Sequence, residues 1–187
     1  DPLFEFLITP ALEQHSFPAL TSQIDVLRDN WLKACLTFDI SQAEKVVNQA
    51  FAMIPVEAVC TEILQKGISE IGRLWYLNKA SVQQEHFASS VAIRHIETLI
   101  TATPNPTLEQ TIMVGCPPGE WHSFPVLILT LFLRRKGLNV IYLGANVPLE
   151  QLEQTAAAIH PAMVILAAQQ LSTAATLRSA ALLFQQL

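Results

Sequence analysis

The sequence predicts an α/β protein in which an all-α four-helix bundle precedes a Rossmann-like parallel sheet. Two observations lead to this expectation. From Ser22 to Thr103, apolar residues recur at helical spacing in four segments that short breaks separate. From Thr111 onward, short apolar runs typical of buried strands alternate with helical segments, which favours a parallel sheet with right-handed crossovers.

The N-terminal part divides into an arm and the first two helices. Residues 1–21 contain three prolines among apolar residues, and we expect them to form an irregular arm. The bundle follows over residues 22–103, and its first helix begins directly after the arm. The second helix is expected to begin at Ser41, because Glu44 three residues later completes a capping-box signature, and to stop near Pro55.

The other two helices of the bundle have their own start signals. The third can begin at Pro55, which a first turn tolerates, and is expected to run to about Tyr76. Gly67 and Gly72 lie inside it and make a regular helix less favourable. The fourth is expected to begin at Ser81, with Gln84 in the reciprocal capping position.

The Rossmann-like domain is expected over residues 108–187, after the turn-forming segment Thr103–Thr107. Its elements are expected in the following order: strand Thr111–Cys116, a helix ending at Arg135, strand Leu138–Leu143, helix Pro148–Ile159, strand Met163–Ala167 and a helix reaching Leu187. About five strands are usual in such a sheet, so we expect the domain to be incomplete at its C-terminus.

Composition excludes several classes of protein. Hydrophobic residues make up 51% and charged residues 14% of the 187 residues, which excludes a disordered chain. The longest apolar run, Val126–Leu133, is too short to span a bilayer, so we expect a soluble, cytoplasmic protein. The net charge of −5 gives no basic stripe, and contact with DNA would need a domain outside this sequence. Three widely spaced cysteines form no metal-binding pattern.

Glu120 and His122 form the first candidate site. They follow the first predicted strand, at the edge where parallel sheets bind ligands. A carboxylate that holds one imidazole nitrogen leaves the other nitrogen for a metal. A single His binds a metal weakly unless the metal brings other ligands, as the cobalt of a corrin ring does. The alternative is that both residues cap the following helix.

Trp75 and Glu85–His86 form the second candidate site. They flank one predicted loop and would project from the same end of the bundle, where an aromatic plane beside polar groups could cover a flat ligand. The alternative is a Trp buried at a helix end, with Glu85 favouring a helix N-terminus. Nucleophile elbows, phosphate loops and paired catalytic carboxylates are absent from the sequence, so we expect no enzyme.

In their order along the chain, with Trp75 and Glu85–His86 before Glu120 and His122, the two sets of residues resemble the cobalamin-binding region of CarH/LitR-type photoreceptor regulators in the MerR family. The resemblance covers roughly residues 22–187. In that family, a Trp-x9-Glu-His motif in a four-helix bundle covers the upper face of adenosylcobalamin, and Trp75 with Glu85–His86 matches it in full. An acid-x-His-x-x-Gly motif supplies the lower axial His, and here Glu120 and His122 match it.

The resemblance implies a light-sensing mechanism. His122 would replace the nucleotide tail of the cofactor on cobalt, Trp75 would pack against the upper ligand, and Glu85 and His86 would surround the adenosyl group. Light would break the cobalt–carbon bond and shift the bundle relative to the Rossmann-like domain. In the family, this change dissolves a homo-oligomer and frees DNA.

This sequence departs from the family pattern at three places. Pro125 stands where the second motif has Gly, near the nucleotide tail. Ala168–Leu171 replaces a Ser-x-Leu element after the third strand, and Tyr76 replaces the His that lets some members form a bis-His photoproduct. Two other functions therefore stay open. One is a corrinoid methyl carrier of a methyltransferase system, although carriers typically have Asp before the His and lack the Trp cover. The other is a cofactor-free oligomerisation scaffold.

Overall fold

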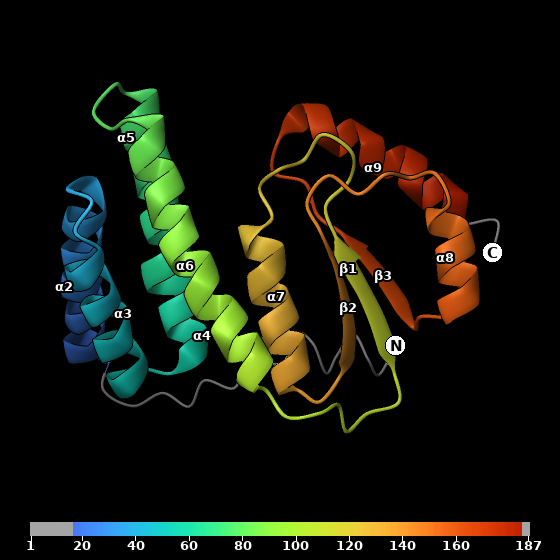
Figure 1. The fold of residues 1–187 in the computed structure, drawn as a ribbon, viewed down its shortest axis with the longest axis horizontal. Helices are drawn as coiled ribbons and strands as arrows, with labels where there is room; N and C mark the ends of the chain where they lie inside the picture. Colours follow the sequence, from blue (N-terminus) through green and yellow to red (C-terminus); the bar gives the residue numbers. More distant parts are fainter. Residues whose placement is uncertain (1–16, 185–187) are drawn as a thin grey trace. The chain divides into compact units, whose positions relative to one another are not determined.

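A computed structural model describes residues 17–184 and divides into two compact units that meet at Arg94 and His95. The first unit is helical and the second contains the sheet (Figure 1). Most of the expected arm lies outside the described residues. The last five residues of the expected arm, 17–21, are helical, so the prediction of an irregular arm is wrong for them. They belong to helix α2 (Phe17–Leu36). Pro18 lies in the first turn of α2, where a helix does not need the N–H that proline lacks.

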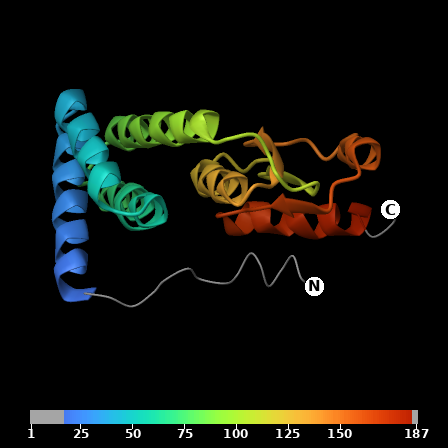
Figure 2. The ribbon, with the colours of Figure 1, turned by 90° about the horizontal axis from the view of Figure 1, so that it is seen from below.

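The helical unit consists of α2, α3 (Ile40–Met53), a long composite helix and the first part of α6 (Val82–Ala102). Helix α3 packs along α2, and α2 also packs against the composite helix (Figure 2). The core is apolar and closed to solvent; its largest members are Trp31, Val47, Ile63, Leu64 and Ile71. This burial of large side chains is the main favourable term for folding of the unit.

The caps of the helices show which start signals the chain uses. The Ser41–Glu44 capping box is wrong, because α3 begins at Ile40 and the carboxylate of Asp39 accepts the Gln42 N–H at 3.0 Å. Asp39 precedes Ser41 in the chain, and its carboxylate already accepts the Gln42 N–H, one of the donors that have no partner within the helix. The second box is confirmed: Gln84 Oε1 accepts the Ser81 N–H at 2.7 Å, and Ser81 Oγ accepts the Gln84 N–H at 3.2 Å.

The composite helix runs without a break from Val56 to Tyr76 but contains a widened turn. It comprises α4 (Val56–Ala58), the π-helical segment η1 (Val59–Gln65) and α5 (Lys66–Tyr76). The expected start at Pro55 is early by one residue, because the helix begins at Val56 and Pro55 is its N-cap. The irregularity that the two glycines indicated does occur in this helix, but it precedes both of them.

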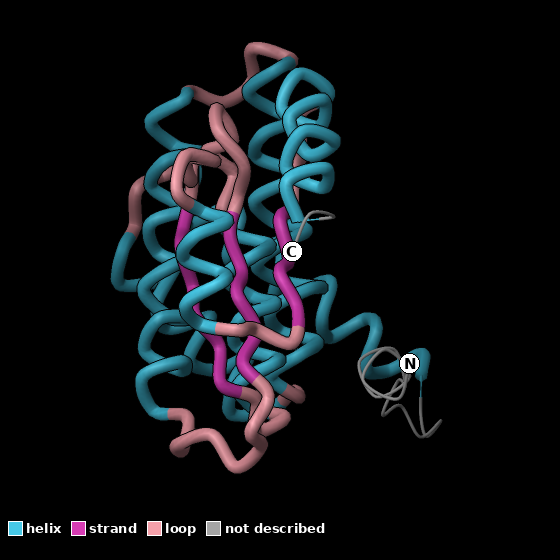
Figure 3. Tube along the Cα trace, turned by 90° about the vertical axis from the view of Figure 1, so that its right-hand side faces the viewer, coloured by secondary structure: helices cyan, strands magenta, loops and turns pink. Residues whose placement is uncertain are grey.

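The sheet unit contains three parallel strands in the order β2-β1-β3 (Figure 3). Its elements are β1 (Thr111–Gly115), α7 (Phe124–Arg135), β2 (Asn139–Gly144), α8 (Leu152–Ile159), β3 (Met163–Leu166) and α9 (Leu171–Phe184). Ile112 pairs with Val140 on one side and with Met163 on the other. The predicted fold class is confirmed, with a helical N-terminal region and a parallel sheet.

Two helices enclose the sheet. Helix α7 packs against β1 and β2, while α8 packs through Leu152 and Ala156 on Met113, a buried residue of the central strand. Helix α8 begins four residues later than expected, because Gln151 has a φ of +65°, which no α-helix accommodates. Within residues 17–184, none of the helices has the length and hydropathy that a bilayer crossing needs.

Candidate functional site

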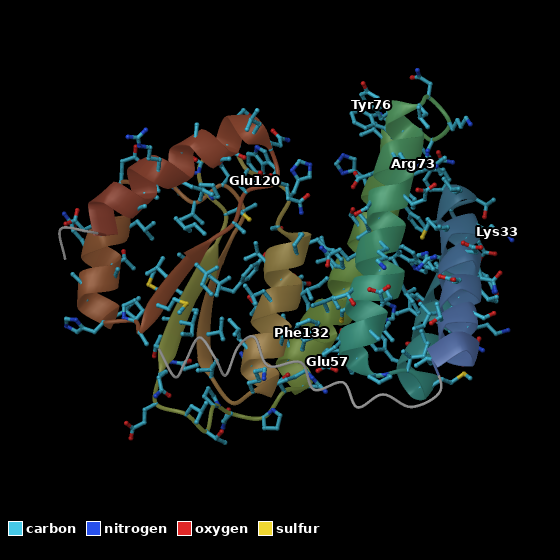
Figure 4. The ribbon with its side chains drawn as sticks, turned by 180° about the vertical axis from the view of Figure 1, so that it is seen from behind. Lys33, Glu57, Arg73, Tyr76, Glu120 and Phe132 are labelled. Atoms are coloured by element: carbon cyan, nitrogen blue, oxygen red, sulfur yellow. The ribbon has the colours of Figure 1, made fainter. Side chains whose placement is uncertain are left out.

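Glu120 and His122 lie in the loop that joins β1 to α7, at the carboxyl edge of the sheet. Figure 4 labels Glu120. The Glu120 side chain is fully buried, whereas that of His122 is 51% exposed. Glu120 Oε1 lies 2.6 Å from His122 Nδ1 and also accepts the backbone N–H of His122 at 3.0 Å. Since an ionised carboxylate only accepts hydrogen bonds, Nδ1 is the nitrogen that donates here, and in the neutral ring Nε2 is left with a lone pair for a metal.

The second oxygen of Glu120 holds the start of helix α9. Oε2 accepts the backbone N–H groups of Gln169 and Gln170 at 2.8 and 3.1 Å and the hydroxyl of Thr173 at 2.7 Å. Glu120 is therefore a cap, but for α9 and not for the helix that follows it. The N-cap residue of α7, Ser123, makes no side-chain capping bond, so the capping alternative is wrong as it was stated.

Sequence reasoning missed Thr173, which lies 53 residues after its partner. Nothing in the spacing connects the two residues, because the loop after β1 and the start of α9 meet only once the strands are paired. The one available signal was a hydroxyl residue near the start of the helix that follows the third strand.

The backbone of the β1–α7 loop is fixed by the loop after β2. Asn146 Oδ1 accepts the Gly119 N–H at 2.7 Å, and the Glu120 carbonyl accepts the Asn146 N–H at 2.9 Å. Gly119 has a φ of +81°, which a residue with a side chain rarely adopts. Because the Glu120 carboxylate also binds the start of α9, the connections after all three strands meet at one residue, Glu120.

The electrostatics of the loop keep Glu120 ionised. Burial raises the pKa of its carboxyl, but hydrogen bonds from Thr173, from the backbone N–H groups of His122 and Gln169 and from the His122 ring outweigh burial and hold that pKa well below its ordinary range. The neighbouring Cys116 behaves in the opposite way. Burial, aided by the charge of Glu120, raises the pKa of its thiol to about 11, so it stays protonated and is a poor metal ligand.

The residues of the second motif lie around the loop between α5 and α6. Trp75 is in the last turn of α5 and 51% exposed, so the alternative of a Trp buried at a helix end is wrong. Glu85 and His86 are in the first turn and a half of α6, and Glu85 Oε1 accepts the Ser89 hydroxyl at 2.8 Å. Tyr76 is 82% exposed at the end of α5 (Figure 4).

The residues present fit a corrinoid better than a bare metal ion. Among residues 17–184, no group of three or more His, Cys, Asp or Glu side chains could hold a metal ion together. His122 presents a single nitrogen, so a metal bound there must bring its remaining ligands. Pro125 is compatible with this loop, because it lies in the first turn of α7, where proline is favoured.

Comparison with known proteins identifies the helical unit. Residues 27–100 match the B12 binding domain family. The chain is 28% identical over 137 residues to the HTH-type transcriptional repressor CarH of Myxococcus xanthus, covering 73% of this chain and 46% of the relative. It is 25% identical over 149 residues to the repressor CarA of the same organism, covering 80% and 50%. The chain thus spans about half the length of these curated relatives.

A solved structure supports the fold. The monomethylamine corrinoid protein of Methanosarcina barkeri aligns with a TM-score of 0.70 and 16% identity over 83% of this chain and 76% of that one. At this identity the likeness concerns the fold alone. The resemblance that the two motifs indicated is confirmed by the B12 binding domain and the two repressors. Residues 27–100 thus form a B12 binding domain, and the chain is similar in sequence to the CarH and CarA repressors.

Proposed function

We propose that this chain is a sensory and regulatory module, not an enzyme, that binds adenosylcobalamin with His122 as the lower axial ligand. The observation that carries the proposal is the half-exposed imidazole of His122, whose Nδ1 is held by a buried carboxylate 2.6 Å away. This bond fixes the tautomer and orientation of the ring and makes Nε2 a better donor to a metal. The similarity to two transcriptional repressors supports a regulatory role over a catalytic one.

Each site residue has a defined task. His122 Nε2 is the group that would hold cobalt, and Glu120 keeps that ring in place through a network anchored on α9. Trp75 offers a half-exposed indole to the upper ligand, while Glu85 and His86 offer polar groups to the edges of the adenosyl moiety. When bound, adenosylcobalamin supplies a cobalt–carbon bond that visible light can break.

The proposed output is a light-dependent change of assembly. A homo-oligomer in the dark, DNA binding through a separate domain of a longer protein and a cytoplasmic location all belong to this proposal. Tyr76 has no imidazole, so we expect no bis-His product after illumination.

The test is spectroscopic. Purified protein is mixed in the dark with adenosylcobalamin or methylcobalamin, freed of unbound ligand, and measured by visible absorption and size-exclusion chromatography before and after green light. We expect retained colour with adenosylcobalamin, photolysis and a change in size. No retained colour with either compound would refute cobalamin binding, and retained colour without a size change would refute the light-dependent output.

Two variants test the lower ligand. His122→Ala should change the visible spectrum of the bound cofactor, because cobalt loses the imidazole. His160→Asn is the matched control: it removes another exposed imidazole at a residue with a φ of +51°, a conformation that Asn tolerates. Identical spectra for wild type and His122→Ala would remove His122 as the ligand. Preference for methylcobalamin, with methyl transfer to a thiol acceptor by a partner enzyme, would favour a carrier instead.

A further inference from the structure

The composite helix that ends in Trp75 contains a widened turn whose bonds differ from those of an α-helix. In η1, the backbone N–H of Lys66 is bonded to the carbonyl of Thr61, five residues earlier, and to that of Ile63. In an uninterrupted α-helix the same N–H would bond to Glu62. Widened turns of this kind are rare and frequently occur at functional sites.

The composite helix presents one buried face on both sides of the widened turn. Its buried residues are Val59, Cys60, Ile63, Leu64, Gly67 and Ile71. Trp75 follows Ile71 by four residues, in the last turn of α5. Because Trp75 comes after η1, the number of residues per turn in η1 sets the direction in which Trp75 leaves the helix.

Arg28 of α2 stabilises the widened turn from outside. Its Nη1 donates to the Glu62 carbonyl at 3.1 Å, the acceptor that Lys66 would use in an α-helix. Its Nη2 is 2.6 Å from Asp25 Oδ1 one turn earlier, and the Arg28 side chain is only 22% exposed. The guanidinium is therefore held in place while it supplies a donor to a carbonyl of η1.

Gly67 lets the helix directly after η1 lie against α2. A Cβ built on Gly67 would be 2.6 Å from Cζ3 and 2.8 Å from Cε3 of Trp31, which is fully buried. The absence of a side chain is thus a requirement of packing. Arg28 and Trp31 come from the same helix and contact the composite helix at and just after the widened turn.

We propose that Arg28 is a positioning residue for the upper face of the cofactor site: its hydrogen bond to Glu62 maintains the widened turn of η1 and so directs the Trp75 indole toward the upper ligand. This inference rests on the proposed role of Trp75. Conversion of η1 to an α-helix would turn every later residue of the helix, Trp75 included, by about 100° for each residue that the wide turn absorbs.

The experiment uses the full chain and two changes at one position. Arg28→Met removes the donor but keeps an apolar stem, whereas Arg28→Lys keeps a cationic donor. In a Trp121→Phe background, acrylamide quenching reports Trp75, because Trp31 is buried. We expect Arg28→Met to change this quenching and to weaken adenosylcobalamin binding about fivefold to tenfold, as for loss of one oriented aromatic contact. Binding of hydroxocobalamin, which lacks the adenosyl group, should stay within twofold, and Arg28→Lys should restore part of the loss.

A double-mutant cycle distinguishes positioning from a purely structural role. In a Trp75→Ala background, Arg28→Met should have no further effect on adenosylcobalamin binding. Equal weakening of both cobalamins, or the same weakening with and without Trp75, would overturn the inference. So would unchanged Trp75 quenching in Arg28→Met. The quenching arm uses protein without cofactor, so it still decides the inference if wild type binds no cobalamin, a result that would refute the proposed function separately.

Discussion

Both motifs are short in sequence, yet the protein stabilises them in different ways. Around His122, each oxygen of Glu120 accepts at least two hydrogen bonds, and the loops after three strands meet there. Trp75 lies half exposed at a helix end, and the shape of its helix sets its direction. A ligand to a metal must be held before the metal arrives, whereas a cover for a large group must keep its surface free. Substitutions at Glu120 and His122 should therefore lower the free energy of unfolding, whereas substitutions at Trp75 should lower only the affinity for the cofactor.

The largest effect is expected at the buried carboxylate. Glu120→Ala leaves the N–H groups of His122, Gln169 and Gln170 without their acceptor, at about 1–3 kcal/mol for each donor that water cannot reach, whereas the Thr173 hydroxyl keeps the Gln170 carbonyl. We expect the free energy of unfolding in urea to fall by at least about 3 kcal/mol. Glu120→Gln keeps one acceptor oxygen and should lose less. Equal, small losses for both variants would show that the network does not stabilise the fold.

The same carboxylate predicts a dependence of stability on pH. Its pKa is lower in the folded protein than the value near 4.3 of an unfolded chain. Its contribution is therefore complete above that value and declines as the pH falls from about 5 toward the folded pKa. The difference in unfolding free energy between wild type and Glu120→Gln should shrink between pH 7 and pH 3. A difference that stays constant over this range would contradict the assignment.

The next largest change in stability is expected at Gly67 of α5, and Gly72 of the same helix is the control. Gly67→Ala places a methyl group against Trp31 and should destabilise the helical unit by about 1–3 kcal/mol. Gly72→Ala meets nothing within 4 Å and should instead stabilise the helix, by up to about 1 kcal/mol. Thermal unfolding followed by circular dichroism measures both changes. If the two variants shifted Tm in the same direction, the close contact between Gly67 and Trp31 would be wrong.

A smaller loss of stability is expected at His122. His122→Ala removes one hydrogen bond to Glu120, but the backbone N–H of residue 122 and the donors from α9 still satisfy the carboxylate. Because the ring is half exposed, we expect a loss of about 1 kcal/mol in urea unfolding at pH 7. A loss as large as that of Glu120→Ala would mean that the imidazole is structural.

The smallest loss of stability is expected at Trp75. Its side chain is half exposed, so Trp75→Ala should change the unfolding free energy by no more than about 0.5 kcal/mol. The affinity for adenosylcobalamin should fall nonetheless, as measured by equilibrium dialysis in the dark. A large stability loss with unchanged affinity would reverse the contrast between the two sites.

The sequence predicts the elements of this fold well where a local signal decides them. The alternation of apolar runs places all three strands within one residue at each end, and Ser81 with Gln84 places the start of α6. The start of α3 is off by one residue, because Asp39 and Ser41 are both good caps and only the backbone conformation chooses between them. The start of α2 is off by five, because Pro18 favours a break or a first turn equally.

The parts of the site that the sequence did not predict depend on contacts between distant residues. Thr173 and the N–H groups of Gln169 and Gln170 reach Glu120 only because β3 lies beside β1. The widened turn has no signal in the spacing of apolar residues. The buried residues of the composite helix span about 140° and fit one face of an ordinary α-helix, so their period does not distinguish the two kinds of turn.

The widened turn also affects how this helix is compared with others. A turn that closes five residues apart accommodates one residue more than an α-helical turn, while the flanking segments keep their faces. A relative whose corresponding helix is regular throughout would therefore align here with a one-residue gap between Val59 and Gln65. Distances in sequence counted from α2 to Trp75 would then differ by one between the two proteins, although the count from Trp75 to Glu85 would not.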